Sequence, residues 1–167
     1  MRITNYVQDS IVDGTGLRFT LFTQGCPHGC IGCHNPDTHD PNGGKEMSVD
    51  EIINIMLSNP LTDGITFSGG EPFSQAEDCA RIALAAKKAG LNVWAYSGWT
   101  FEQLIDNTVH GSKDLLELCD VLVDGPFVLA RRSLLLKWRG SENQRVLDVK
   151  KSLEANVPIH WEAPKYI

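Results

Sequence analysis

The sequence predicts an α/β fold in which parallel strands form a partial, open (β/α) barrel of about five to six strand–helix units. Short apolar segments alternate with longer amphipathic ones, and glycine-rich turns follow the short segments. Parallel neighbours need crossover connections, which the amphipathic segments supply. A closed eight-unit barrel needs about 250 residues, more than the 167 present. We expect one domain over residues 1–167, because no linker, repeat or low-complexity tract interrupts the pattern.

The individual elements can be read along the chain. Residues 17–23 alternate apolar and polar positions with the period of a strand. Ser48 and Glu51 form a capping-box pattern that opens a helix, and a strand at 64–68 follows it. Strong helix formers at 75–89 end at a glycine. The remaining expected elements are a strand at 92–96, a helix that begins with the capping-box pair Thr100 and Gln103, a helical segment at 114–119 and a strand at 121–123.

Composition and charge exclude several kinds of partner. The formal charge of −6 is spread over interspersed acidic and basic residues without a Lys/Arg block, which argues against nucleic acid as a partner. No apolar run approaches the length of a membrane span, and residues 1–10 do not resemble a signal peptide. Free cysteines on a loop imply a reducing compartment, so we expect a cytoplasmic protein.

Three cysteines carry the strongest functional signal. Cys26, Cys30 and Cys33 lie close together on a loop rich in glycine and proline, where thiols have little to pack against. Three thiolates predict a metal site with one coordination position left open for a substrate or cofactor. The 5 cysteines are an odd, sparse count, which disfavours a disulfide framework. Cys79 and Cys119 lie in apolar surroundings and are expected to be buried, inert thiols.

A structural zinc site is the serious alternative. It would require a fourth ligand, and His28, His34 and His39 all lie near the cysteines. The spacing of the cysteines alone leaves this possibility open.

A second motif follows the strand at 64–68. Gly69 and Gly70 allow close approach of a ligand to the backbone, and the carboxylate of Glu71 can accept hydrogen bonds from an ammonium group. A plain strand-to-helix turn, with Glu71 in the first helical turn, would also explain these residues. The functional interpretation is favoured because the cysteine loop also follows a strand, and the carboxyl ends of parallel strands form the ligand face.

The cysteine loop at 26–33 and Gly-Gly-Glu-Pro at 69–72 together resemble the radical S-adenosylmethionine superfamily. Residues 10–18 and 22–36 resemble the glycyl-radical-enzyme activases within it. The segments 121–127 and 138–145, with the short chain, resemble the family of small activating proteins of anaerobic ribonucleoside-triphosphate reductase.

This resemblance implies that Cys26, Cys30 and Cys33 bind a 4Fe-4S cluster whose fourth iron is chelated by S-adenosylmethionine. Electron transfer from the cluster would yield methionine and a 5′-deoxyadenosyl radical, which would abstract hydrogen from a glycine Cα of the reductase. No general base is needed, so no catalytic side chain is assigned. The implied cofactor contacts are Gly69, Gly70 and Glu71 for the methionyl ammonium, Gly32 and His34 near the adenine, and Ser97 and Asp124 as further contacts that could instead cap adjacent turns.

One position departs from the wider superfamily. An aromatic residue often precedes the third cysteine there, whereas this chain has Gly32. A stacking role against adenine would therefore pass to His34.

The resemblance also implies partners. These are the glycyl radical subunit of anaerobic ribonucleoside-triphosphate reductase and a flavodoxin-type reductant, and Trp138 and Arg139 are of residue types enriched at interfaces. Packing in the core is the alternative for Trp138. Arg18 is expected to form an internal ion pair with an acid such as Asp13. The sequence does not assign the tail at 158–167.

Two other functions stay open at this point. One is activation of another glycyl radical enzyme, or another radical S-adenosylmethionine reaction. The other is a non-catalytic zinc or iron–sulfur electron-transfer module.

Overall fold

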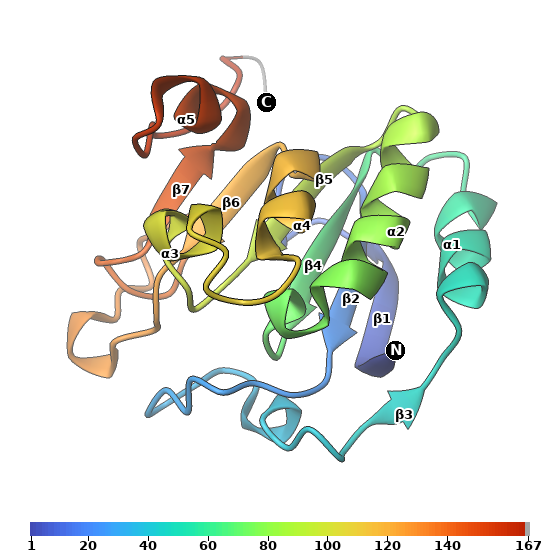
Figure 1. Cartoon of the computed structure of the whole chain (residues 1–167), viewed down its shortest axis with the longest axis horizontal. Helices are drawn as coiled ribbons and strands as arrows, with labels where there is room; N and C mark the ends of the chain where they lie inside the picture. The colour runs from blue at the N-terminus through green and yellow to red at the C-terminus, as the bar shows by residue number, and fades with distance from the viewer. Residues whose placement is uncertain (166–167) are drawn as a thin grey trace.

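The computed structural model describes residues 1–165 and contains one seven-stranded sheet in the order β3-β1-β2-β4-β5-β6-β7 (Figure 1). The strands are β1 (Arg2–Ser10), β2 (Arg18–Thr23), β3 (Lys45–Glu46), β4 (Gly64–Gly69), β5 (Asn92–Tyr96), β6 (Val121–Asp124) and β7 (Arg145–Asp148). The α-helices are α1 (Val49–Ser58), α2 (Ala76–Lys88), α3 (Phe101–Ile105), α4 (Ser112–Leu118) and α5 (Val149–Ala155). Short 3-10 helices are η1 (Pro36–Thr38), η2 (Pro72–Gln75) and η3 (Leu129–Arg131).

The centre of the sheet is parallel and its two edges are antiparallel. Strands β2, β4, β5 and β6 pair in parallel and in chain order, as successive strands of a barrel do. Strand β1 pairs antiparallel with β2, and β7 pairs antiparallel with β6. No pairing joins β3 to β7 in the described chain, so the sheet is not closed. The predicted open α/β fold is confirmed.

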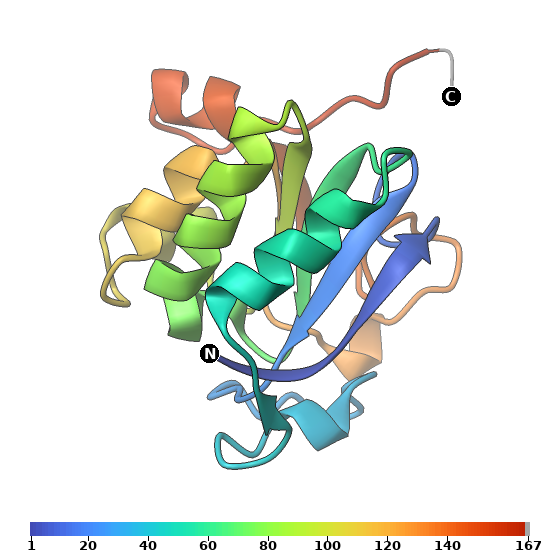
Figure 2. The same cartoon turned by 90° about the vertical axis from the view of Figure 1, so that its right-hand side faces the viewer.

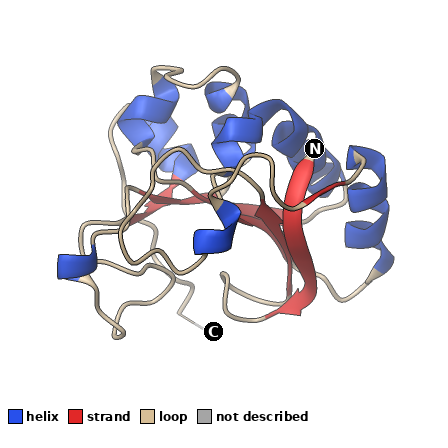
Figure 3. Cartoon of the chain, turned by 90° about the horizontal axis from the view of Figure 1, so that it is seen from below, coloured by secondary structure: helices blue, strands red, loops and turns tan. Residues whose placement is uncertain are grey.

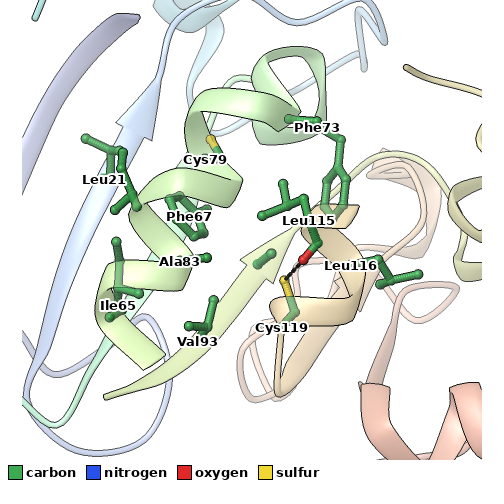
Figure 4. Close-up of a cluster of buried hydrophobic side chains, with 14 of the residues drawn as sticks. Leu21, Ile65, Phe67, Phe73, Cys79, Ala83, Val93, Leu115, Leu116 and Cys119 are labelled. Atoms are coloured by element: carbon green, nitrogen blue, oxygen red, sulfur yellow. Dashed lines mark hydrogen bonds between the residues drawn. The ribbon is translucent and has the colours of Figure 1, made fainter. Parts of the chain in front are cut away.

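Helices cover one face of the sheet and enclose the main core. Figure 2 shows α1, α2 and α4 side by side on this face, and Figure 3 shows helices gathered along one side of the sheet. The inward side chains of β2, β4 and β5 meet the apolar stripes of these helices, as Figure 4 shows for Leu21, Phe67, Ala83 and Leu115. Burying such side chains removes apolar surface from water, which stabilises each by roughly 1.5–3 kcal/mol.

Two predicted features of this core are confirmed. Cys79 and Cys119 are buried in it, and the Cys119 thiol donates to the Leu115 carbonyl at 3.3 Å (Figure 4). Burial raises the pKa of both thiols, because the charged thiolate loses its hydration. Both are therefore inert neutral groups.

The helix starts expected from the sequence agree with the structure, whereas the strands at the edges of the sheet were not expected. Ser48 caps α1 by accepting from the Glu51 amide, and Thr100 and Gln103 form the expected capping box on α3. Strands β1 and β7 and helix α5 were not predicted. The outward residues of β1 are polar or exposed, so its apolar alternation is weak.

The tail up to residue 165 returns to the sheet. Leu147 of β7 forms an isolated antiparallel bridge with His160, and the Trp161 amide donates to the Val146 carbonyl at 2.9 Å. The rest of the unassigned 158–167 segment, residues 166 and 167, lies outside the described residues. None of the helices described here has the length and apolar character needed to cross a membrane.

Candidate functional site

The carboxyl ends of the four parallel strands meet around one cavity of about 470 Å³. Its size is that of a pocket for a drug-sized ligand. The wall combines the loop after β2 with the ends of β4, β5 and β6, and a later loop closes one side. Lining residues include Cys26, Cys30, Cys33, His34, Gly69, Gly70, Ser97, Gly98, Gly125 and Gly140. The predicted ligand face is thus a single concave site.

The cysteine loop is fixed at its start and is irregular beyond it. The Gly25 amide donates to the Thr38 carbonyl at 2.7 Å, and the Cys26 amide donates to the His39 carbonyl at 3.2 Å. The Cys33 amide closes a turn on the Cys30 carbonyl at 3.2 Å. Burial raises the pKa of the Cys26 thiol, and the negative charges of Glu71, Cys30 and Cys33 add to the rise. Bound iron cations would relieve this repulsion between thiolates.

Gly69 and Gly70 bring β2 and β4 into close contact beside the cysteines. Gly69 has φ of +91°, and a Cβ there would lie 2.7 Å from the Phe22 Cα. A Cβ on Gly70 would lie 2.4 Å from the Gly25 carbonyl oxygen. Only glycine fits at these positions, and it leaves backbone groups facing the cavity.

The Glu71 carboxylate is fully buried and surrounded by internal donors. It accepts from the Phe73 amide at 3.0 Å, the Ser97 hydroxyl at 3.0 Å and the Gly98 amide at 2.9 Å. His28 Nε2 lies 2.6 Å from Glu71 Oε2. These partners use the acceptor capacity of the carboxylate, and Glu71 is absent from the described cavity wall. The cavity therefore presents glycine backbone at this point.

Ser97 and Asp124 support the strand ends in a similar way. Ser97 lines the cavity, while its hydroxyl donates to Glu71 and accepts from the Trp99 amide at 3.0 Å. Asp124 is buried, accepts from the Phe101 amide at 2.7 Å at the start of α3, and pairs with Arg145. These bonds support the turn-capping interpretation of both side chains.

A loop comprising residues 128–142, here called the rim loop, borders the cavity. The Val128 amide donates to the Ser141 hydroxyl at 3.1 Å, and the Glu142 amide donates to the Arg131 carbonyl at 2.9 Å, which closes the base of the loop. His34 lies against the Phe127 ring at 5.1 Å between centroids. A Cβ on Gly32 would meet the Leu129 side chain at 2.9 Å. The residues expected near adenine thus lie where the cysteine loop meets this rim.

The expected ion pair between Arg18 and Asp13 is wrong. Arg18 is fully buried and donates to Thr66 Oγ1, Asn92 Oδ1 and two backbone carbonyls, and no ion pair to Asp13 is found within residues 1–165. Asp13 instead accepts from the Thr20 hydroxyl at 3.0 Å and from Ser10. Burial lowers the pKa of Arg18 to about 10, because the charges of the nearby acids Asp63, Asp120 and Asp13 offset only part of the desolvation of the guanidinium.

Trp138 and Arg139 are engaged within the protein. Trp138 packs edge-on against Trp94 and Trp161, at centroid distances of 5.4 Å in both cases. Arg139 Nη1 donates to the Glu142 and Gln144 carbonyls at 3.2 and 2.6 Å. The packing alternative for Trp138 is therefore supported, and Arg139 organises the rim loop.

The donor set fits an iron–sulfur cluster better than a single zinc ion. Among residues 1–165, no three His, Cys, Asp or Glu side chains are gathered closely enough to hold one metal ion. A zinc site requires ligands that converge on one centre, whereas each cluster thiolate binds its own iron. Of the three histidines near the cysteines, His28 is bonded to Glu71 and His34 packs on Phe127. His39 lines the cavity with an Nε2 atom that has no partner in the described chain, but it belongs to no group of three possible ligands there. The three cysteines nevertheless line one cavity, as a cluster requires.

Sequence reasoning missed several contributors to the site. Phe22, Tyr96, Phe127 and Gln144 line the cavity and were not singled out as site residues. The contact between His28 and Glu71 was also missed. These groups meet across long stretches of sequence, so local spacing held no signal for them.

The cysteine loop and the parallel strands that carry it lie within a match to a family of iron–sulfur proteins with one cluster. The 4Fe-4S single cluster domain family matches residues 12–147. Anaerobic ribonucleoside-triphosphate reductase-activating proteins from Salmonella typhimurium and Escherichia coli K12 are 36% and 34% identical over 154 residues, covering 87% of this chain and 97% of each relative. The protein of that name from Enterobacteria phage T4 is 29% identical over 143 residues, covering 81% of this chain and 86% of its own.

The chain therefore belongs to the family of anaerobic ribonucleoside-triphosphate reductase-activating proteins. A solved structure of QueE from Escherichia coli aligns with a TM-score of 0.49 at 19% identity, covering 59% of this chain and 52% of that one. That structural similarity is too limited to carry further conclusions.

Proposed function

We propose that this chain, folded as one domain, is the radical S-adenosylmethionine enzyme that generates the glycyl radical of an anaerobic ribonucleoside-triphosphate reductase. One observation carries the proposal: the three cysteines and the glycine backbone at residues 69–70 line the same cavity of about 470 Å³. A zinc or electron-transfer module has no use for that glycine backbone. The names of the relatives support this target over other glycyl radical enzymes.

The residues of the chain hold and shield the reactants. Cys26, Cys30 and Cys33 would ligate the cluster, which when bound supplies the electron that cleaves S-adenosylmethionine and so initiates hydrogen abstraction from the reductase glycine. Gly69 and Gly70 would receive the methionyl end through their backbone groups. Gly32 and His34 would lie near the adenine, while Glu71, Ser97 and Asp124 fix the strand ends that form the wall.

The rim loop is our candidate contact for the reductase. Leu134 and Leu135 are 84% and 95% exposed. Between Asp124 and Glu142 the chain has four cationic side chains and no acidic one, in a protein with a net charge of −6. Trp138, Arg139 and Gly140 of the same loop line the cavity. Because the loop borders the cavity, its exposed leucines and cations are placed to contact the protein that supplies a glycine segment, and the occupant we propose is an apolar reductase surface bordered by carboxylates.

The cellular setting follows from the chemistry. An oxygen-sensitive cluster with free thiols requires a reducing compartment, so we propose a cytoplasmic location. A small flavodoxin-type protein is the proposed electron donor.

The test is anaerobic reconstitution with iron and sulfide, reduction with dithionite and measurement of 5′-deoxyadenosine formed from S-adenosylmethionine. We expect product from the wild-type protein and none from Cys30→Ala. Addition of the reductase should then yield a glycyl radical signal. A zinc-loaded protein that takes up no cluster and forms no product would refute the proposal.

A further inference from the structure

The segment between the cysteines is tied to the sheet at one side chain. Apart from the turn that the Cys33 amide closes on the Cys30 carbonyl, residues 27–32 make one hydrogen bond to other parts of the described chain, from His28 to Glu71 at 2.6 Å. Cys26 is fixed by its backbone bond to His39. Cys30, which lies four residues later, has no such anchor of its own. The position of Cys30 therefore depends on His28.

Both members of this pair are held rigidly. The Glu71 side chain is 0% exposed, and its bonds to Phe73, Ser97 and Gly98 fix its direction. The His28 side chain is 13% exposed, and its ring meets Trp99 edge-on at 4.7 Å. Because a carboxylate can only accept, the His28 Nε2–H group donates. A hydrogen bond to a charged acceptor in a buried setting is among the stronger ones.

Gly98 makes room for the imidazole. A Cβ on Gly98 would lie 2.4 Å from His28 Cδ2, so the end of β5 has a slot that only glycine leaves open. The pair thus joins the cysteine loop to the ends of β4 and β5 at once.

We propose that His28 and Glu71 are positioning residues that hold Cys30 over the cavity and so retain the cluster next to the site of S-adenosylmethionine. This inference rests on the proposed function. Glu71 then acts through His28 and does not contact the methionyl ammonium with its carboxylate.

His28 variants give the clean test. Glu71→Gln would place an amide donor among the donors that now surround the carboxylate, which disturbs the fold itself. His28→Ala removes only the link, because Glu71 keeps its other three donors. His28→Gln retains an N–H group on a flexible side chain and serves as the conservative rescue. His110→Ala is the matched control, since His110 and Glu77 form a His–Glu pair at 2.9 Å that is exposed and remote from the cavity.

Two readouts separate positioning from general stability. After reconstitution, we expect iron loss to a chelator to be at least tenfold faster in His28→Ala, less so in His28→Gln, and unchanged in His110→Ala. In the reduced protein, the change in the electron paramagnetic resonance spectrum on adding S-adenosylmethionine should be diminished in His28→Ala and largely restored in His28→Gln. Metal-free His28→Ala should melt below the wild type, because Glu71 loses one of its donors, yet stay folded at the temperature of the iron-loss assay.

Equal iron retention and an equal spectral change in His28→Ala and the wild type would overturn the inference. A wild-type protein that binds a cluster and forms no 5′-deoxyadenosine would refute the proposed function, while the iron-loss comparison would still decide the role of His28. A wild-type protein that binds no cluster would overturn both.

Discussion

Replacing Gly69 by alanine tests whether close contact between β2 and β4 builds the site. Gly69 has φ of +91°, where an alanine costs about 1–2 kcal/mol more than glycine. Its new Cβ would also lie 2.7 Å from the Phe22 Cα and the Thr23 nitrogen, both of which are backbone atoms. Displacing packed atoms costs about 1–3 kcal/mol. The expected loss of unfolding free energy is therefore about 2–5 kcal/mol.

Gly90→Ala is the matched control. Gly90 ends helix α2 with φ of +80°, and a Cβ there meets nothing within 4 Å. Only the conformational cost of about 1–2 kcal/mol applies. Urea denaturation of the metal-free proteins measures both losses. Gly69→Ala should also weaken S-adenosylmethionine binding by tenfold or more in the reconstituted protein, which Gly90→Ala should not. Equal stability losses in the two variants would refute the steric argument.

Three further predictions concern the rim and the support of the strand ends. Leu135→Ser should raise the reductase concentration for half-maximal activation roughly tenfold and leave reductase-independent 5′-deoxyadenosine formation unchanged. Leu61→Ser is the control at another exposed leucine, in the turn before β4, and should change neither quantity. Arg145→Met should lower the unfolding free energy by about 2–3 kcal/mol in urea denaturation, because it leaves the buried Asp124 carboxylate without its cation; a loss below about 0.5 kcal/mol would contradict this. Arg145 also lowers the pKa of Glu102. The stabilisation from the Glu102 carboxylate is therefore present above its ordinary pKa and lost as the pH falls through the lowered value. Glu102→Gln should melt below the wild type at about pH 6, and the difference between the two melting temperatures should vanish at about pH 3.

Much of the fold could be predicted because its centre obeys local rules. Residues 17–23 and 92–96 alternate or run apolar as strands do, and Ser48 and Thr100 cap the helices that follow. The edges could not be predicted in this way. Strand β1 is held by backbone pairing to β2 across a turn, and only Ile3 and Ser10 of its residues are buried. Edge strands therefore depend on neighbours that the local pattern does not specify.

The site shows a similar division. The three cysteines and two glycines could be proposed from sequence motifs, because metal ligands and close backbone contacts require particular residue types. The structure brings all five to one cavity. The hydrogen-bond and ion-pair partners of the charged side chains could not be predicted in this way. Arg18 was expected to pair with Asp13, yet its side chain reaches Thr66 and Asn92 on β4 and β5. Which of several nearby polar groups a buried cation meets is decided by tertiary packing.

The direction in which the acidic side chains point also has a physical reason. The cavity must accept three thiolates, and a free carboxylate facing them would repel these anions in a poorly hydrated space. The oxygens of Glu71 and Asp124 are bound within the protein. Backbone amides and His28 bind Glu71, and a backbone amide and Arg145 bind Asp124. Gly69, Gly70, Gly98 and Gly125, whose backbone groups carry no net charge, line the cavity. Asp13 lines it as well, with its Oδ2 atom bound by the hydroxyls of Ser10 and Thr20. Mutations of Glu71 and Asp124 should therefore act through the geometry of the strand ends, whereas the contacts that we propose to the reactants are made by the cysteines and the glycine backbone.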